Sequence, residues 1–211
     1  MRNNLSYDKI ELENESFSMR QNISALILAG GKSCRMGADK ALLEAGGITI
    51  VERILRQLRE LFPEVLISAN NPQKFSFLGV RVVEDLCPGA GPIAGIAAGL
   101  SAAANELLFV TACDIPEIDI AFVQKLLALA PEYEIVVPVT ADGHYEPLHA
   151  VYRRSVLGRI EELLSQGVFK IIELYDRCET QEVYASSRTP LRNLNTREDY
   201  SSYLRFLLEN R

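Results

Sequence analysis

Short apolar runs alternate with helix-like segments from residue 23 onward, and this alternation limits the chain to few folds. The runs are apolar at nearly every position and cover residues 23–28, 65–69, 80–83, 107–110 and 135–137. Strands that are apolar on both faces are typical of a mostly parallel sheet covered by helices. We expect helices at residues 50–62, 92–104, 118–129, 155–164 and 198–208, and a further strand at 148–152.

No stretch rich in Pro, Gly or Ser divides the chain, so we predict one α/β domain over residues 22–211. A chain of 211 residues is long enough to bury one substantial core. Residues 1–21 are polar and show no periodicity. We interpret them as a disordered N-terminal extension.

The charge balance excludes several classes of partner. The chain has 22 Lys and Arg against 28 Asp and Glu, a net charge of −6. Proteins that bind nucleic acid or anionic membranes in general are usually basic, so neither partner is expected. The most membrane-like region, residues 93–113, is interrupted by Asn105 and Glu106, which favours a buried helix and strand over a membrane span.

The cysteines and histidines give no support for a structural zinc site or a disulfide scaffold. Four cysteines occur without a CxxC pair, and the only histidines are His144 and His149. No apolar secretory segment is visible near the N-terminus, where several acidic residues lie. We therefore expect a cytoplasmic protein.

The loop after the first predicted strand carries the most chemistry. Residues 28–40 read LAGGKSCRMGADK, in which Lys32, Arg35 and Lys40 are opposed only by Asp39. Glycines allow the backbone to approach a ligand and to present N–H groups to phosphate. Ligands of open α/β sheets bind beyond the carboxyl ends of the strands. Glycine alone would fit a simple turn, but the added cations favour a phosphate site.

Two well-known phosphate motifs are absent from the sequence. The Walker loop needs an earlier glycine where this chain has Leu26, and residues 89–95 have one residue too many for GxGxxG. Neither motif therefore describes the glycine loop, and a turn that simply needs glycine stays the alternative to a phosphate site.

Polar residues follow three later strands, at Asn70, Asp85 and Asp114. The carboxyl ends of parallel strands meet at one edge of a sheet, so these side chains should line the cleft of the glycine loop. A carboxylate beside phosphate oxygens is a natural ligand of Mg²⁺. A helix N-cap or a solvated turn would explain each Asp equally simply.

Residues 28–42 match the pattern LAGGxSxRMGxDKAL at every fixed position. This pattern resembles the signature of the molybdenum cofactor guanylyltransferases, the MobA family, and the resemblance spans about residues 23–200. It implies a three-layer α/β/α domain with a Rossmann-like sheet of the nucleotide-diphospho-sugar transferase type. It also implies transfer of GMP from GTP to molybdopterin that already carries molybdenum. The products would be molybdopterin guanine dinucleotide and pyrophosphate.

The resemblance also implies roles for individual residues. Arg35, Lys40 and Asp114 would be catalytic, with Asp114 holding Mg²⁺ or Mn²⁺. The nucleotide would contact Leu28, Ala29, Gly30, Gly31, Lys40, Asn70, Asp85 and Asp114. Some family members have Asn where this chain has Ser68, and Asn70 could replace that contact. Residues 91–96 are similar to the family's GPLAG segment, which also suits tight packing of a helix on a strand.

Two later segments resemble family regions and carry the residues expected to bind the second substrate. Residues 146–152 resemble an EPLxAxY region, and residues 193–200 resemble NxNTPEDY with Arg197 in place of Pro. Acceptor binding would fall to Glu146, Pro147, Asn193 and Asn195. Thr196 with the acids after it also fits a helix N-cap.

Several alternatives stay open at this stage. A cytidylyltransferase for the same pterin is the nearest rival, although such relatives usually read LAAG in the glycine loop. A non-catalytic nucleotide sensor or adaptor on the same fold is another. Catalysis would rest on positioning and electrostatics, so a catalytic His144 or His149 is not required. Besides GTP and molybdopterin, transient contacts with other proteins of cofactor biosynthesis or with recipient enzymes are expected.

Overall fold

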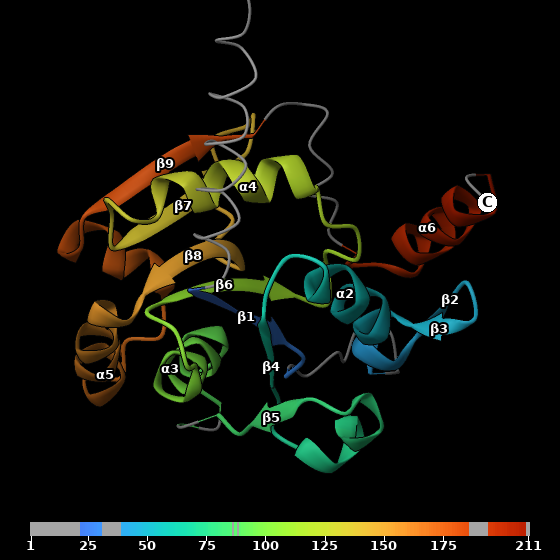
Figure 1. The fold of residues 1–211 in the computed structure, drawn as a ribbon, viewed down its shortest axis with the longest axis horizontal. Coiled ribbons are helices and arrows are strands. Elements are labelled where there is room, and N and C mark those ends of the chain that lie inside the picture. The colour runs from blue at the N-terminus through green and yellow to red at the C-terminus, as the bar shows by residue number, and fades with distance from the viewer. Residues whose placement is uncertain (1–21, 31–38, 86, 88, 186–193, 210–211) are drawn as a thin grey trace, which may run out of the picture.

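The computed structural model describes residues 22–30, 39–85, 87, 89–185 and 194–209. A seven-stranded sheet in the order β5-β4-β1-β6-β8-β7-β9 forms its centre (Figure 1). Its strands are β1 (Ile23–Leu28), β4 (Glu64–Ser68), β5 (Arg81–Val83), β6 (Leu107–Ala112), β7 (Ile135–Val139), β8 (His149–Arg153) and β9 (Thr180–Tyr184). β8 runs antiparallel to its two neighbours, and the remaining neighbouring pairs are parallel. The mostly parallel sheet predicted from the apolar runs is confirmed.

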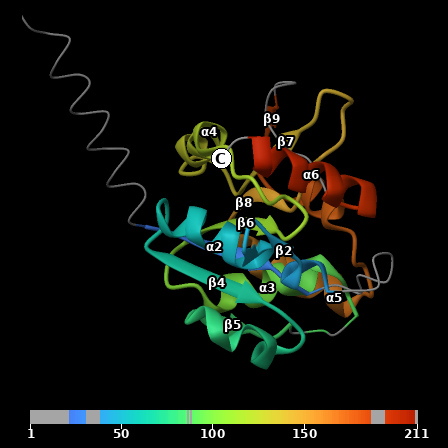
Figure 2. The same cartoon turned by 90° about the vertical axis from the view of Figure 1, so that its right-hand side faces the viewer.

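Helices cover both faces of the sheet, which gives three layers (Figures 1 and 2). They are α2 (Ile50–Arg59), α3 (Pro92–Ala102), α4 (Ile120–Leu129), α5 (Leu157–Ser165) and α6 (Arg197–Glu209). α3 and α5 contribute to the hydrophobic core on one face, and α2, α4 and α6 to the core on the other. The predicted α/β/α architecture is therefore present.

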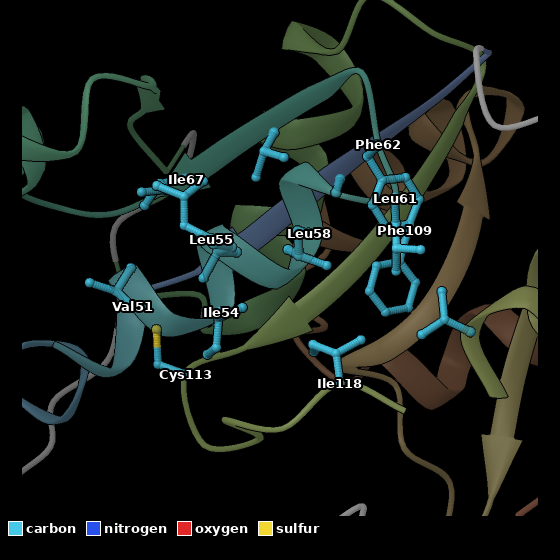
Figure 3. Close-up of a cluster of buried hydrophobic side chains, with 14 of the residues drawn as sticks. Val51, Ile54, Leu55, Leu58, Leu61, Phe62, Ile67, Phe109, Cys113 and Ile118 are labelled. Carbon is cyan, nitrogen blue, oxygen red and sulfur yellow. The ribbon is translucent and has the colours of Figure 1, made fainter. Parts of the chain in front are cut away.

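α2 shows how the local sequence produces this packing. Thr49 caps the helix by accepting a hydrogen bond from the backbone N–H of Glu52 at 3.3 Å. The apolar side chains at helical spacing are buried on one face, among them Ile54 and Leu58 (Figure 3). Beyond the helix, the ring of Phe62 stacks on Phe109 of β6 with 5.4 Å between centroids. The helix is thereby held against the middle of the sheet.

The apolar region 93–113 forms a helix and a strand, as predicted. Ile93 to Leu100 are buried between the sheet and α5, and α3 ends before Asn105. Among the described residues, no helix is long and apolar enough to cross a membrane.

Several short elements of the structure were not predicted from the sequence. They are β9, the two-stranded hairpin β2 (Glu44–Ala45) and β3 (Ile48–Thr49), and the 3-10 helices η1 (Lys40–Leu42), η2 (Pro72–Leu78), η3 (Arg154–Val156) and η4 (Ile171–Arg177). β9 lies at the edge of the sheet and is mostly half-exposed, so it lacks the apolar run that marks a central strand. The hairpin turns at Gly46 and Gly47, whose φ angles are 68° and 88°.

Two helices begin later than their apolar periodicity predicted. α4 begins at Ile120 because Asp119 caps it, accepting from the N–H of Phe122 at 3.0 Å. α5 begins at Leu157 because the chain first forms the 3-10 turn η3. The proposed extension at residues 1–21 lies outside the described residues and stays a prediction.

Candidate active site

The carboxyl ends of four parallel strands are aligned in register at one edge of the sheet. Leu28 at the end of β1 pairs with Ser68 of β4 on one side and with Ala112 of β6 on the other, and Ser68 pairs with Val83 of β5. The residues that follow each strand therefore emerge at one level. This confirms the prediction that the polar strand ends meet at a single edge.

The edge is also the switch point of the fold. The chain passes from β1 to β4 on one side, and later returns to place β6 on the other side of β1. The crossover helix α2, between β1 and β4, and the crossover helix α3, between β5 and β6, cover opposite faces of the sheet. In open α/β sheets the ligand crevice lies at such a point, which here is between the carboxyl ends of β1 and β6. The backbone N–H of Cys113 donates to the carbonyl of Leu28 at 3.4 Å, which brings the glycine loop and Asp114 to the two sides of that crevice.

Asp114 carries a carboxylate oxygen that is short of partners. Its Oδ1 is buried and accepts no hydrogen bond from the described residues. Burial raises the pKa of Asp114, while the charge of Lys40 acts in the opposite direction. A buried carboxylate oxygen without a donor is costly unless a cation completes it. The residues present therefore fit a divalent cation held by Asp114 together with ligand oxygens.

The described residues offer no self-sufficient metal cage, since no group of three or more His, Cys, Asp or Glu is gathered among them. This agrees with the way Mg²⁺ is usually held, by one or two carboxylates together with substrate phosphates and water. The backbone of Asp114 is held by a hydrogen bond, in which the N–H of Leu194 donates to the Asp114 carbonyl at 2.7 Å.

Lys40 reaches the site from η1, directly after the glycine loop. Asp39 caps this short helix through the N–H of Ala41 and pairs with Lys74 at 3.2 Å. The ammonium of Lys40 donates to Oδ1 of Asn195 at 3.3 Å. Two residues assigned to different substrates by the sequence are therefore in contact with each other.

Asn195 is itself held by the start of α6. The carboxylate of Asp199 accepts from the backbone N–H groups of Asn195 at 2.9 Å and of Thr196 at 2.8 Å. The hydroxyl of Thr196 accepts in return from the N–H of Asp199 at 3.1 Å. The N-cap interpretation of Thr196 is confirmed.

Gly30, Asn70 and Asp85 lie together on the other side of the crevice. A Cβ built on Gly30 would be 3.5 Å from Oδ2 of Asp85 and 3.7 Å from Nδ2 of Asn70. The absence of a side chain at Gly30 therefore keeps open the space in front of two polar groups. The predicted approach of the glycine backbone to a ligand stays a prediction.

Ser68 is a participant that sequence reasoning left unassigned. Its hydroxyl donates to Oδ1 of Asp85 at 2.5 Å. Gly95 of α3 lies close by, since a Cβ there would be 2.8 Å from Oγ of Ser68 and 2.7 Å from Cδ2 of Leu28. The signal in the sequence was a serine at the end of an otherwise apolar strand. The packing interpretation of the segment 91–96 is confirmed at Gly95.

The structure leaves some predicted site residues untested. Gly31, Arg35 and Asn193 lie outside the described residues. Glu146 and Pro147 are half-buried in the connection from β7 to β8, which also emerges at the carboxyl edge of β7. Their backbones bond to Pro138 and to the hydroxyl of Tyr152.

The two histidines have no arrangement suited to proton transfer at the crevice. His149 is fully buried against Phe109, with Nδ1 3.3 Å from the hydroxyl of Thr111. Burial lowers the pKa of His149 to about 4, so its ring is neutral near pH 7. His144 is exposed and pairs with Asp142 two residues away.

Cys113 is equally unsuited to act as a nucleophile. Burial and the neighbouring carboxylate of Asp114 raise the pKa of the Cys113 thiol.

A groove of 640 Å³ lies at the opposite edge of the sheet, near the start of β7. Glu134, which lines this groove, accepts hydrogen bonds from the hydroxyl of Ser155 at 2.7 Å, from Arg159 at 2.8 Å and from the N–H of Glu179 at 3.2 Å. These bonds tie the chain together locally. The groove is separate from the crevice with the glycine loop and Asp114.

Comparison with known proteins gives a consistent result. A model of the MobA-like NTP transferase domain matches residues 25–182. A protein of Carboxydothermus hydrogenoformans named probable molybdenum cofactor guanylyltransferase is 35% identical over 192 residues, which cover 88% of this chain and 96% of that relative.

Solved structures show the same fold. Molybdopterin-guanine dinucleotide biosynthesis protein A from Archaeoglobus fulgidus superposes with a TM-score of 0.76 at 21% identity, covering 88% of this chain and 99% of that one. The Rv0371C protein of Mycobacterium tuberculosis, solved in complex with manganese, gives a TM-score of 0.66 at 22% identity, covering 88% and 98%. The nucleotide-diphospho-sugar transferase type of fold predicted from the sequence is confirmed.

Proposed function

Because the chain belongs to the family of MobA-like NTP transferase domains, we propose that it transfers GMP from GTP to molybdopterin. The observation that carries the proposal is the crevice between β1 and β6. It gathers a buried, unpartnered carboxylate oxygen at Asp114, the ammonium of Lys40, and the neighbouring Gly30 and Asp85. Such a set suits a nucleoside triphosphate, with the base on one side and the phosphates on the other.

In this reaction a phosphate oxygen of molybdopterin attacks the α-phosphorus of GTP. A new P–O bond forms, and the bond from the α-phosphorus to the oxygen of the β-phosphate breaks. Pyrophosphate leaves with the electron pair of that bond. The attacking phosphate is already anionic near neutral pH, so the step needs no general base, in keeping with the buried neutral His149. The protein contributes positioning and charge stabilisation.

The phosphates would lie between the glycine loop and Asp114. Lys40 emerges beside both, and its ammonium would stabilise the charge on the transferred phosphate. Arg35 would add a second cation from the same loop. Leu28, Ala29, Gly30 and Gly31 would follow the nucleotide with backbone groups.

Asp114 would hold the divalent cation, Mg²⁺ or Mn²⁺. The bound cation would offset repulsion among the phosphates and stabilise charge on the leaving pyrophosphate. The buried, unpartnered Oδ1 of Asp114 supports this assignment, as does the manganese complex of the mycobacterial relative.

The nucleoside would lie against Asp85 and Asn70. Guanine presents an N1–H and an exocyclic amine on one edge, and a carboxylate can accept from both. Oδ2 of Asp85 lies beside Gly30, where a base entering over the glycine loop would meet it. Asp85 therefore supports guanine as the base.

The pterin would approach from the β7–β8 connection and the turn before α6, through Glu146, Pro147, Asn193 and Asn195. The contact of Asn195 with Lys40 links this side to the phosphates. The setting would be the cytoplasm, in keeping with the free Cys87, Cys113 and Cys178. Other proteins of cofactor biosynthesis and recipient enzymes would meet the chain transiently.

The test is to incubate the purified protein with Mg²⁺, molybdate-loaded molybdopterin and each nucleoside triphosphate in turn. The expected result is release of pyrophosphate with GTP and formation of the guanine dinucleotide. Preferential release with CTP would reject guanylyl transfer. No release with any triphosphate would support the non-catalytic adaptor.

A further inference from the structure

Ser68 and Asp85 form a buried hydrogen-bonded pair behind the glycine loop. Ser68 is the last residue of β4 and is 1% exposed. Its hydroxyl donates to Oδ1 of Asp85 at 2.5 Å. Hydrogen bonds from a hydroxyl to a carboxylate at such distances are among the stronger ones in proteins.

The two oxygens of Asp85 have different surroundings. Oδ1 is enclosed by the Ser68 hydroxyl and by α3, because a Cβ on Gly95 would lie only 3.3 Å from it. Oδ2 lies beside Gly30, 3.5 Å from where a Cβ on that residue would be, and it accepts no hydrogen bond from the described residues. One oxygen is thus held inside the fold and the other is turned toward the crevice.

We propose that Ser68 is a positioning residue for nucleoside recognition, which acts by fixing the Asp85 carboxylate with Oδ2 toward the base. The proposal rests on the proposed function, because it assigns Asp85 to the guanine edge. Ser68 is too buried to touch the nucleotide. Oδ2 can accept from a donor on the edge of the base only while the carboxylate keeps one orientation, and the hydrogen bond to Oδ1 restricts its rotation.

The chain contains a matched control for a purely structural role. Ser24 of β1 is 0% exposed and donates to Oε2 of Glu64 at 2.5 Å. This pair lies at the opposite end of the same two strands, since Ser24 pairs with Glu64 where Leu28 pairs with Ser68. Removal of either hydroxyl takes the serine donor from a carboxylate oxygen, but only Ser68 is next to the crevice. Ser24→Ala also removes an acceptor of Asn105, while Oε2 of Glu64 keeps the N–H of Ala104 at 2.8 Å.

The experiment compares Ser68→Ala with Ser24→Ala in the full chain. Equilibrium binding of GTP and ATP in the presence of Mg²⁺ is measured by titration calorimetry, without the pterin. Loss of a hydrogen bond to a charged group corresponds to roughly a tenfold weakening. We expect Ser68→Ala to weaken GTP binding by about that factor and to reduce the preference for GTP over ATP. Ser24→Ala should retain the wild-type values.

A double-mutant cycle shows whether Ser68 acts through Asp85. If it does, Ser68→Ala should add no further loss of GTP affinity to that of Asp85→Asn. Thermal unfolding of each variant identifies any general loss of stability. Additive losses, or equal effects of Ser68→Ala and Ser24→Ala on GTP binding, would overturn the proposal.

The outcomes separate this proposal from the proposed function. Wild-type protein that binds GTP selectively, with binding unaffected by Ser68→Ala, overturns the role of Ser68 alone. Selective binding that depends on Ser68, without pyrophosphate release when the pterin is added, overturns guanylyl transfer alone. Wild-type protein that binds no nucleoside triphosphate overturns both.

Discussion

The ammonium of Lys40 donates a hydrogen bond to the side-chain carbonyl of Asn195 at 3.3 Å, across 155 positions of sequence. The contact joins η1, which follows the glycine loop, to the turn that begins α6. Asp199 holds that turn through two backbone N–H groups. The C-terminal helix therefore helps to place a cation that the proposed reaction needs.

Replacing Asn195 should impair turnover more than folding. In Asn195→Ala the Lys40 ammonium loses its acceptor and samples more rotamers, and we expect pyrophosphate release to fall by about tenfold, as for a hydrogen bond to a charged group. Arg205→Ala, at an exposed position of α6, is the control. Equal activity of the two variants would contradict a role of Asn195 in placing Lys40.

Asp114→Asn should abolish turnover without loss of the fold. Burial raises the pKa of Asp114, so this residue favours the folded state below its unfolded pKa and the benefit is lost as pH rises through the folded pKa. At pH 7 without metal, the Asn variant should therefore unfold at a denaturant concentration no lower than the wild type. A marked destabilisation would show that the carboxylate has a protein partner.

Divalent metal should change the melting temperature of the wild type but not that of Asp114→Asn. Addition of Mn²⁺ with GTP should raise the melting temperature of the wild type, because a ligand that binds only the folded state stabilises it. The rise should be absent in Asp114→Asn and should be reversed by EDTA in the wild type. A similar rise in both proteins would place the metal away from Asp114.

His149 should make the fold sensitive to acid. Its pKa is lowered by burial to about 4 in the folded protein from an ordinary value of 6.5, so its contribution is fully present above pH 6.5 and is lost as pH falls toward 4. The contribution corresponds to about 3 kcal/mol. Urea unfolding of His149→Phe should lose this part of the pH dependence, and the exposed His144→Gln should retain it. If the free energy of unfolding of His149→Phe depends on pH as that of the wild type does, His149 is not the source of the acid sensitivity.

Gly95→Ala should disturb both packing and nucleotide binding. The new methyl group would lie 2.7 Å from Cδ2 of Leu28 and 2.8 Å from Oγ of Ser68. We expect a loss of about 1–3 kcal/mol in the free energy of unfolding, with weaker GTP binding by calorimetry. Gly158→Ala in α5 is the control, because a Cβ there meets nothing within 4 Å. A neutral Gly95→Ala would show that α3 can move aside.

The main strands and helices could be predicted from the sequence because each is marked by a pattern within its own residues. Runs such as residues 23–28 and 107–110 are apolar on both faces, and α2 shows apolar residues at helical spacing. β9 and the hairpin at Gly46 were not predicted. Edge strands and short hairpins depend on contacts with residues elsewhere in the chain, which a local sequence pattern does not contain.

The sequence by itself determined the alternation of strands and helices, the glycine loop and the acidic residues at the strand ends. Only the tertiary structure decided that Lys40 meets Asn195, that Ser68 holds Asp85, and that Oδ1 of Asp114 is buried without a partner. The physical reason is that these contacts arise from strand register and helix docking. Both are set by the burial of side chains far apart in the chain, and no short stretch of sequence contains them.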